Sequence, residues 1–288
     1  MSRLSETVRV GSLEVAAISD SAPDVTDFAR HLPGVDAVDW MREVGITKPD
    51  DPVPFNLGSF LIRGDGRTTL VDAGYGVFGR TLGAPGCGEL PERIAELGVA
   101  LEEVDAVVQT HLHPDHVGWL IDEDRDNALT FPNATVYVSR TELDHWLSPE
   151  ADPQRLEFVR RCVLPAYEAD RIEPVDGEGA VSPSLTMVPT PGHTPGHCSL
   201  LIASGGERLL ITGDVAYHPA HIVRPEWRTF LEYDPAEAER SRRKVAELAI
   251  ARDALVTGGH FGILTLGRLR RVETGYAWEA VATPEPHA

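Results

Sequence analysis

Thr110-His111-Leu112-His113-Pro114-Asp115-His116 is the stretch that decides how this chain is interpreted, because it places three histidines and an aspartate side by side. Packing so many ionisable side chains together costs a large desolvation free energy. A bound cation offsets this cost, because it neutralises the carboxylate and binds the lone pairs of the imidazoles. All the ligand atoms on offer are nitrogen or oxygen, which suits zinc and also manganese, iron or cobalt. The stretch therefore predicts a metal site.

The residues on either side of this stretch predict where the site lies in the fold. Residues 104–110 are short, apolar and β-branched, which is typical of a buried strand. Pro114 can occupy the first turn of a helix that runs through Val117, Trp119 and Leu120. A strand that ends where a helix begins holds ligands rigidly and exposes them, so the pattern favours an α/β protein.

Three more predicted strands end in candidate ligands. Residues 185–188 lead into Thr-Pro-Gly-His-Thr-Pro-Gly-His, which contains His193 and His197. Residues 209–213 lead into Asp214, and residues 254–259 lead into His260. Each motif alone could be an ordinary turn aspartate or strand-end histidine. Together with the first cluster, they indicate one shared metal centre.

The order H-x-H-x-D-H, T-P-G-H-T-P-G-H, G-D and G-G-H resembles that of the metallo-β-lactamase superfamily of binuclear hydrolases, over residues 8–261. The resemblance implies a four-layer αββα sandwich, in which helices flank two mixed β-sheets. We expect one such hydrolase domain over residues 1–288, since a chain of 288 residues with 42% hydrophobic residues can bury one large core.

The resemblance also implies a ligand set for two divalent ions, with zinc as the first expectation and manganese, iron or cobalt as alternatives. One ion would be held by His111, His113 and His193, and the other by Asp115, His116 and His260. Asp214 would bridge the two ions. His197 would be a local hydrogen-bonding residue and Asp72 a partner of the ligands rather than a ligand.

The activity implied is hydrolysis of a lactone or carboxylic ester by a hydroxide that bridges two metal ions roughly 3.5–4 Å apart. Asp115 and Tyr217 are the candidate catalytic residues. Tyr217 follows the bridging aspartate by three residues, where N-acyl-homoserine lactonases of the superfamily place a phenol that hydrogen-bonds the lactone. A tyrosine that only packs in the following loop is the competing interpretation.

Other activities of the same fold stay open. Residues 213–219 and 225–227 are similar to the branch that contains methyl-parathion-type organophosphate hydrolases, so a phosphotriesterase is an alternative. A thioesterase is another, because glyoxalase-II-like thioesterases resemble this chain in all seven ligands. A persulfide dioxygenase with one iron is the alternative of another class. It needs fewer ligands, so the presence of Asp115, His116 and His260 argues against it.

Composition limits the partners. The net charge of −19 argues against nucleic acid and anionic membranes, because both need a basic surface. The three cysteines form no C-x-x-C pair, and the first ten residues carry no apolar run of signal-peptide length. We therefore expect a cytoplasmic enzyme with a small-molecule substrate, and a homodimer is compatible with the sequence.

The remaining segments predict the architecture around these motifs. Alternating patterns with glycine turns indicate hairpins over residues 8–18 and 60–71. Helices are expected over residues 91–98, over 140–167 with breaks near Pro149 and Pro153, and from Asp234 to about Arg252. Trp119 and Trp146 should be core residues. The aromatic-rich segments 21–59 and 218–233 could line a substrate pocket or form an interface.

Overall fold

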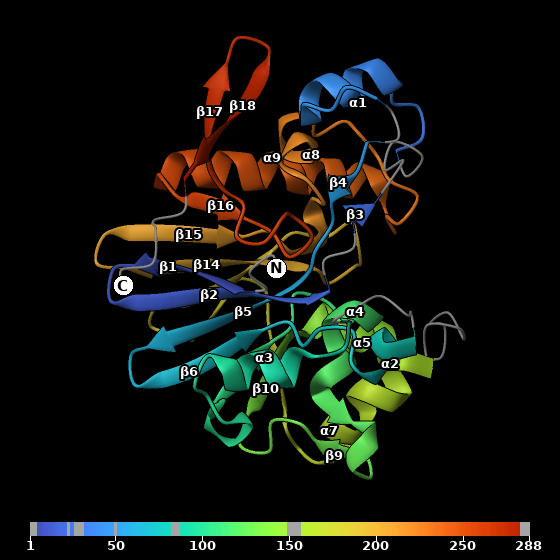
Figure 1. The fold of residues 1–288 in the computed structure, drawn as a ribbon, viewed down its shortest axis with the longest axis vertical. Helices are drawn as coiled ribbons and strands as arrows, with labels where there is room; N and C mark the ends of the chain where they lie inside the picture. Colours follow the sequence, from blue (N-terminus) through green and yellow to red (C-terminus); the bar gives the residue numbers. More distant parts are fainter. Residues whose placement is uncertain are drawn as a thin grey trace.

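The computed structural model describes residues 5–21, 24–25, 32–48, 51–81, 87–148 and 157–282. Two seven-stranded sheets pack face to face, and helices cover the outer side of each (Figure 1). The predicted mixed α/β sandwich is confirmed.

The first sheet contains the amino-terminal half of the chain. Its strands, in spatial order, are β1 (Ser5–Val10), β2 (Leu13–Ser21), β5 (Leu57–Gly64), β6 (Arg67–Val71), β7 (Ala106–Val108), β10 (Thr135–Ser139) and β11 (Ile172–Val175). Pairing is antiparallel from β1 to β6 and parallel from β6 to β11. The two predicted hairpins are present as β1–β2 and β5–β6.

The second sheet contains the carboxy-terminal half. Its strands, in spatial order, are β12 (Gly179–Ser182), β13 (Leu185–Pro189), β14 (Cys198–Ser204), β15 (Glu207–Ile211), β16 (Leu255–Thr257), β17 (Leu266–Val272) and β18 (Gly275–Val281). Only the β15–β16 pair is parallel among these described strands. Two short ribbons pair β3 (Asp24–Val25) with β4 (Val53–Pro54) and β8 (Ile121–Asp122) with β9 (Ala128–Leu129).

Helices lie on both outer faces (Figure 1). On the side of the first sheet are α2 (Val77–Thr81), α3 (Leu90–Glu96), α4 (Pro114–Val117), α5 (Arg140–Leu147) and α7 (Leu164–Glu168). On the side of the second are α1 (Ala37–Val44), α8 (Pro219–Val223) and α9 (Pro235–Arg252). Single helical turns occur at η2 (Leu101–Glu103), η3 (Gly118–Leu120), η4 (Glu123–Arg125), η5 (Val159–Val163) and η6 (Gly213–Val215). No helix among the described residues has the length and apolar character needed to cross a bilayer.

Most predicted helices are confirmed. The helix expected over residues 91–98 is α3, and the one from Asp234 is α9, where the Asp234 carboxylate accepts hydrogen bonds from the amides of Ala236 and Glu237. The segment 140–167 forms α5, the π-helical turn η5 and α7, and the predicted breaks at Pro149 and Pro153 lie outside the described residues.

The helix predicted through Leu120 is shorter than expected. It ends at Val117 and continues as the tight turn η3. The amides of Gly118 and Trp119 donate to the carbonyls of Gly74 and Ala73, so they are not available for a continuous helix. A Cβ on Gly118 would lie 2.1 Å from the carbonyl carbon of Tyr75, so this close approach requires glycine.

Apolar side chains fill the space between the sheets and under the helices. Between the sheets the core includes Val15, Met187 and Leu200, all fully buried. Trp119 and Trp146 are buried in the cluster between the first sheet and its helices, as expected.

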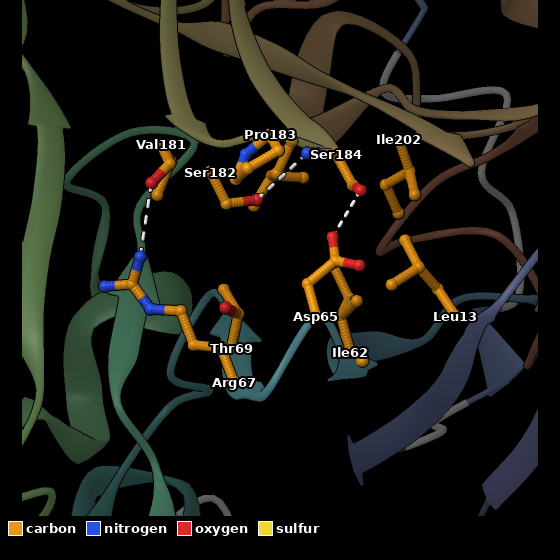
Figure 2. A pocket seen from close by; sticks show the side chains of 12 residues that line it. Leu13, Ile62, Asp65, Arg67, Thr69, Val181, Ser182, Pro183, Ser184 and Ile202 are labelled. Atoms are coloured by element: carbon orange, nitrogen blue, oxygen red, sulfur yellow. Dashed lines mark hydrogen bonds between the residues drawn. The ribbon is translucent and has the colours of Figure 1, made fainter.

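One end of the sandwich is joined by polar contacts between turns of the two sheets (Figure 2). The guanidinium Nη1 of Arg67 donates to the carbonyl of Val181 over 3.2 Å, and the hydroxyl of Ser184 donates to the carboxylate of Asp65. Between these contacts lies a cavity of about 160 Å³ whose lining includes Leu13 and Ile62. This end contains the amino termini of β6 and β13, so the carboxyl ends of these strands lie at the opposite edge.

Candidate metal centre

The predicted ligands meet at the edge where the strands of both sheets end. The loop after β7 carries His111 and His113, and α4 carries Asp115 and His116. The remaining ligand candidates come from the second sheet. They are His193 between β13 and β14, Asp214 in η6 after β15, and His260 after β16. The site is therefore assembled across the two sheets.

The turn that presents Asp214 depends on glycine. Gly213 has a φ of +58°, and a Cβ there would lie 2.6 Å from Nε2 of His197. Only glycine takes this conformation without strain and leaves room for the imidazole. The turn brings the amide of Asp214 within 2.9 Å of Nε2 of His197, which accepts its hydrogen bond.

Three histidines form the first group of ligand atoms. Nε2 of His193 lies 2.7 Å from Nδ1 of His113 and 3.1 Å from Nε2 of His111. All three side chains are at least nine-tenths buried. Their nitrogen atoms lie within 4.8 Å of one another, which is close enough to share one ion.

Asp115, His116 and His260 form a second group. Oδ2 of Asp115 lies 3.6 Å from Nε2 of His116 and 3.5 Å from Nε2 of His260. Both imidazoles are buried, whereas the Asp115 side chain is 22% exposed. Asp115 is therefore the member of the cluster that faces solvent.

Asp214 lies between the two groups. Its Oδ2 is 3.3 Å from Nε2 of His193 and 3.1 Å from Nε2 of His260. Its Oδ1 is 3.3 Å from Nε2 of His116. One buried carboxylate thus contacts both groups.

Hydrogen bonds on the far side of the imidazole rings orient four of the histidines. Nδ1 of His116 lies 2.9 Å from Oδ2 of Asp72, and Nδ1 of His260 lies 2.8 Å from the carbonyl of Asn56. In the same way, Nδ1 of His193 is 2.9 Å from the hydroxyl of Tyr217, and Nδ1 of His111 is 3.1 Å from Oγ1 of Thr110. Each of these partners leaves Nε2 facing the cluster, which is how proteins orient histidine ligands of a metal.

The pKa values in the cluster show a demand for positive charge. Burial lowers the pKa of His111 and of His193 well below 6.5, so both are neutral. Although burial opposes it, the Asp214 carboxylate raises the pKa of His116 and of His260 above that value. Burial likewise opposes ionisation of Asp214, but His260 and His116 hold its pKa well below 3.8. The buried Asp214 carboxylate therefore favours positive charge on the groups around it.

The donor set fits divalent metal ions. Nε2 of His116 and Oδ1 of Asp214 are buried and lie 3.3 Å from each other, and neither makes a further hydrogen bond among the described residues. Buried polar atoms in proteins are normally fully paired, so these two atoms have capacity left for a metal ion. A nitrogen- and oxygen-rich set of this size suits zinc and other first-row divalent ions.

His197 and Asp72 lie beside the cluster, as the sequence predicted. His197 is fully buried, and its Nδ1 lies 3.0 Å from the carbonyl of Thr190, so both of its nitrogens are used in local hydrogen bonds. Asp72 accepts from the amide of Thr110 and contacts His116.

The two segments left open by the sequence pack against each other next to the cluster. Leu32, Trp40 and Val53 from the first form a small core with Ala220 from the second and with Tyr217, which directly precedes it. The sequence did not predict α1 or α8 within these segments. Exposed aromatic side chains also occur here, since Phe230 is 63% and Tyr233 is 65% exposed. Whether the segments also form an interface stays a prediction.

Phe55, one of the aromatic residues of the segment 21–59, lies at the cluster and stacks on the ring of His260 with 4.4 Å between ring centroids. Glu142 escaped the sequence analysis. It lies in α5, is fully buried and receives hydrogen bonds from both loops that carry candidate ligands. No local pattern marks Glu142, whereas Asp36 before α1 and Gly45 after it are cap signals that could have revealed α1.

Comparisons with known proteins agree with this geometry. The family model described as Metallo-beta-lactamase superfamily matches residues 58–260. The N-acyl homoserine lactonase AttM of Rhizobium radiobacter is 31% identical over 232 residues, which are 73% of this chain and 81% of that protein. An N-acyl homoserine lactonase of Bacillus cereus is 29% identical over 168 residues, which are 58% of this chain and 60% of that protein.

Two solved structures have the same fold over almost their entire length. Hydrolase AbOPH, described as a member of the beta lactamase superfamily, has a TM-score of 0.83 with 21% identity, covering 98% of both chains. AidC, described as a dizinc quorum-quenching lactonase, has a TM-score of 0.82 with 22% identity, covering 97% of this chain and 98% of its own.

Family, fold and cluster agree about the general chemistry. The family match starts in β5 and ends at His260, so it includes every predicted ligand. The named relatives and the clustered donors make this protein an enzyme, a metal-dependent hydrolase. The chain belongs to the metallo-beta-lactamase superfamily.

Proposed function

We propose that this chain hydrolyses a lactone with two divalent metal ions, zinc in the first instance. His111, His113 and His193 would hold one ion, and Asp115, His116 and His260 the other. Asp214 would bridge them. The observation that carries this proposal is the position of Asp214 between the two groups. Its Oδ1 lies 3.3 Å from Nε2 of His116 and its Oδ2 lies 3.1 Å from Nε2 of His260, both in the second group. Oδ2 also lies 3.3 Å from Nε2 of His193, in the first group.

The ions would supply Lewis acidity for the substrate carbonyl and lower the pKa of a shared water towards neutrality, which is the source of the hydroxide expected from the sequence. Asp115 has a separate task in this scheme. Its partly exposed carboxylate can take up the proton that the shared water gives up and pass it to the departing alkoxide, while Oδ2 faces His116 and His260.

Tyr217 is positioned to hold a proton for the substrate. When Nε2 of His193 faces the cluster, the proton of that imidazole is on Nδ1 and is donated to the Tyr217 hydroxyl oxygen, 2.9 Å away. The phenol therefore keeps its own hydrogen for another acceptor. Burial raises the pKa of Tyr217 well above 10, so the hydroxyl stays protonated. We infer that it donates to the carbonyl oxygen of the lactone, where charge develops.

Aromatic side chains next to the cluster support a substrate with an apolar part. Phe55 stacks on His260, and its ring centroid lies 6.4 Å from that of Tyr217, so an apolar ring borders one side of the cluster. The exposed rings of Phe230 and Tyr233 occur on the segment that follows Tyr217. The relatives named N-acyl homoserine lactonase make a lactone with an acyl group the first substrate class to test.

Phosphotriester hydrolysis is the second candidate. Residues 213–219 and 225–227 are similar to the branch that contains organophosphate hydrolases, which supports this alternative. A thioester is a further alternative of the same fold. An iron-dependent dioxygenase is disfavoured, because the second group of ligands would then have no role.

One substrate panel separates these candidates. Acyl-homoserine lactones, simple γ- and δ-lactones, aryl esters, a thioester and an aryl phosphotriester would be assayed with the wild type and with Tyr217→Phe. We expect lactone turnover in the wild type and a kcat lower by about 10- to 1000-fold in the variant, with unchanged metal content.

The pattern across the panel identifies the correct alternative. Strong phosphotriester turnover without lactone turnover would transfer the protein to the second candidate. Equal rates of wild type and Tyr217→Phe on every substrate would make Tyr217 a packing residue. Loss of activity on chelation, restored by zinc or manganese, is expected for every hydrolase in this group.

Four further expectations stay predictions. We propose that residues 1–288 form a single hydrolase domain, because the one cluster takes ligands from both sheets. We expect a cytoplasmic location and no nucleic-acid partner from the composition of the chain. Assembly as a homodimer is compatible with the sequence. None of these three expectations rests on a contact described above.

A further inference from the structure

Glu142 is a fully buried carboxylate that receives four hydrogen bonds. Oε1 accepts from the amide of Leu112 over 3.0 Å and from Nε1 of Trp146 over 2.7 Å. Oε2 accepts from the hydroxyl of Thr194 over 2.7 Å and from the amide of Gly196 over 2.9 Å. No lone pair is directed at the metal cluster, so Glu142 does not belong to the predicted ligands.

These hydrogen bonds join the two loops that carry the three-histidine group. Leu112 lies between His111 and His113, in the loop that follows β7 of the first sheet. Thr194 and Gly196 follow His193, in the loop between β13 and β14 of the second sheet. One carboxylate thus connects ligand loops that belong to different sheets.

The surroundings of Glu142 leave little freedom for this connection to shift. A Cβ on Gly196 would lie 2.1 Å from the amide nitrogen of Glu142, so the second loop lies directly against α5. Trp146, one turn further along α5, donates to Glu142 and contacts the ring of His113 edge-on, at 5.8 Å between centroids. Helix α5 therefore contacts His113 through the ring of Trp146, and it contacts both ligand loops through the carboxylate of Glu142.

We propose that Glu142 is a positioning residue that sets the separation of His113 and His193, and through it the affinity of the three-histidine site for its ion. The inference rests on the proposed binuclear function. It concerns one site selectively, because no hydrogen bond joins Glu142 to Asp115, His116 or His260 among the described residues.

The charge state of the side chain matters for this role. Both oxygens accept from N–H groups that cannot reverse their direction, namely two backbone amides and an indole. In Glu142→Gln the amide NH₂ must therefore face at least one N–H donor, whichever way it turns. The loops are expected to separate on that side while the volume of the side chain is kept.

The test measures zinc affinity site by site, by competition with a chromophoric chelator. His260→Ala removes a ligand of the second site and leaves the three-histidine site, and His113→Ala does the reverse. We expect Glu142→Gln to weaken zinc binding by about 10- to 100-fold in the His260→Ala protein and to change it little in the His113→Ala protein.

Asp72→Asn is the matched control. It alters a buried carboxylate that contacts His116, so its main effect is expected in the His113→Ala protein. Because Asp72 also accepts from Thr110, beside His111, a smaller effect on the other protein is expected as well.

The outcomes are distinct. Unchanged zinc affinity in both backgrounds, or equal weakening in both, would overturn the positioning role. A wild-type protein that binds no zinc would instead remove the proposed function. If Glu142→Gln does not fold, Thr194→Val replaces it, since it removes one hydrogen bond to the carboxylate and nothing from α5. A selective loss at the three-histidine site in that variant supports the inference, and no loss overturns it.

Discussion

The two edges of the sandwich use polar residues in opposite ways. At the edge that carries the predicted ligands, polar side chains are buried, and some of their atoms make no further hydrogen bond among the described residues. At the opposite edge, the polar side chains are exposed or only partly buried, and they pair across the two sheets. Arg67 donates to the carbonyl of Val181, and Ser184 donates to the carboxylate of Asp65 (Figure 2).

The same strands lead to both edges. β6 begins at Arg67 and is followed by Asp72, while β13 begins after Ser184 and leads into His193. The difference therefore arises from the residues at the strand ends and not from the sheets. Burying several histidines and carboxylates against one another costs stability, so their crowding at one edge indicates that a ligand there compensates the cost.

The largest effect is expected from Asp214→Ala. The carboxylate contacts both ligand groups, so its loss should release metal from both sites and abolish hydrolysis. Metal analysis and a lactonase assay of the purified variant check this. Full metal content with normal turnover would show that Asp214 bridges nothing and that the two groups act separately.

A smaller loss at the same edge is expected from His197→Ala. Burial lowers the pKa of His197 to about 4, so the neutral ring accepts the amide hydrogen of Asp214 at Nε2. Its removal frees the turn that presents Asp214 but removes no ligand. We expect metal affinity or activity to fall by about 10- to 100-fold. A loss as complete as that of Asp214→Ala would place His197 among the ligands.

Asp20 is a buried carboxylate at the edge of the candidate metal centre, but it contacts none of the predicted ligands. Its substitution shows whether such a carboxylate costs stability by itself. Burial raises its pKa from 3.8 to about 6, against the hydrogen bonds from the amides of Tyr75 and Leu90. A raised carboxyl pKa favours the folded state below pH 3.8, and this contribution is lost as the pH rises through about 6.

Between pH 4 and 7 the free energy of unfolding of the wild type should therefore fall relative to that of Asp20→Asn, by up to about 3 kcal/mol. Denaturant titrations of both proteins at several pH values give the difference. Only its slope with pH is informative, because asparagine also loses an acceptor. A difference that is constant over this range would contradict the expected pKa.

The smallest effect is expected at the opposite edge. Ser184→Ala removes the exposed contact with Asp65, so the free energy of unfolding should change by no more than about 0.5 kcal/mol. Metal content and turnover should equal those of the wild type. A loss of metal in this variant would mean that the two edges are coupled through the sheets.

The sequence predicted which histidines and carboxylates cluster, because their chemistry is local. Histidines and carboxylates crowded into strand ends are rare without a ligand, and glycine turns mark the hairpins β1–β2 and β5–β6 in the same direct way. The end of α4 was predicted less well. Only the fold brings Gly74 and Ala73 to the amides of Gly118 and Trp119.

Long-range contacts explain the residues that the sequence could not reveal. Glu142 looks like any helical glutamate, and its role emerges only when loops from two sheets meet at α5. Tyr217 was predicted from its spacing to Asp214, but its contact with Nδ1 of His193 depends on the turn between β13 and β14. Such contacts have no periodicity or spacing in the sequence.

The most direct test of the binuclear centre is the metal content of wild-type protein purified without added metal. The account predicts about two zinc-like divalent ions per chain, with hydrolysis lost as they are removed by chelation and regained when zinc or manganese is returned. A single iron per chain, or hydrolysis that continues after all metal is shown to be gone, would contradict it.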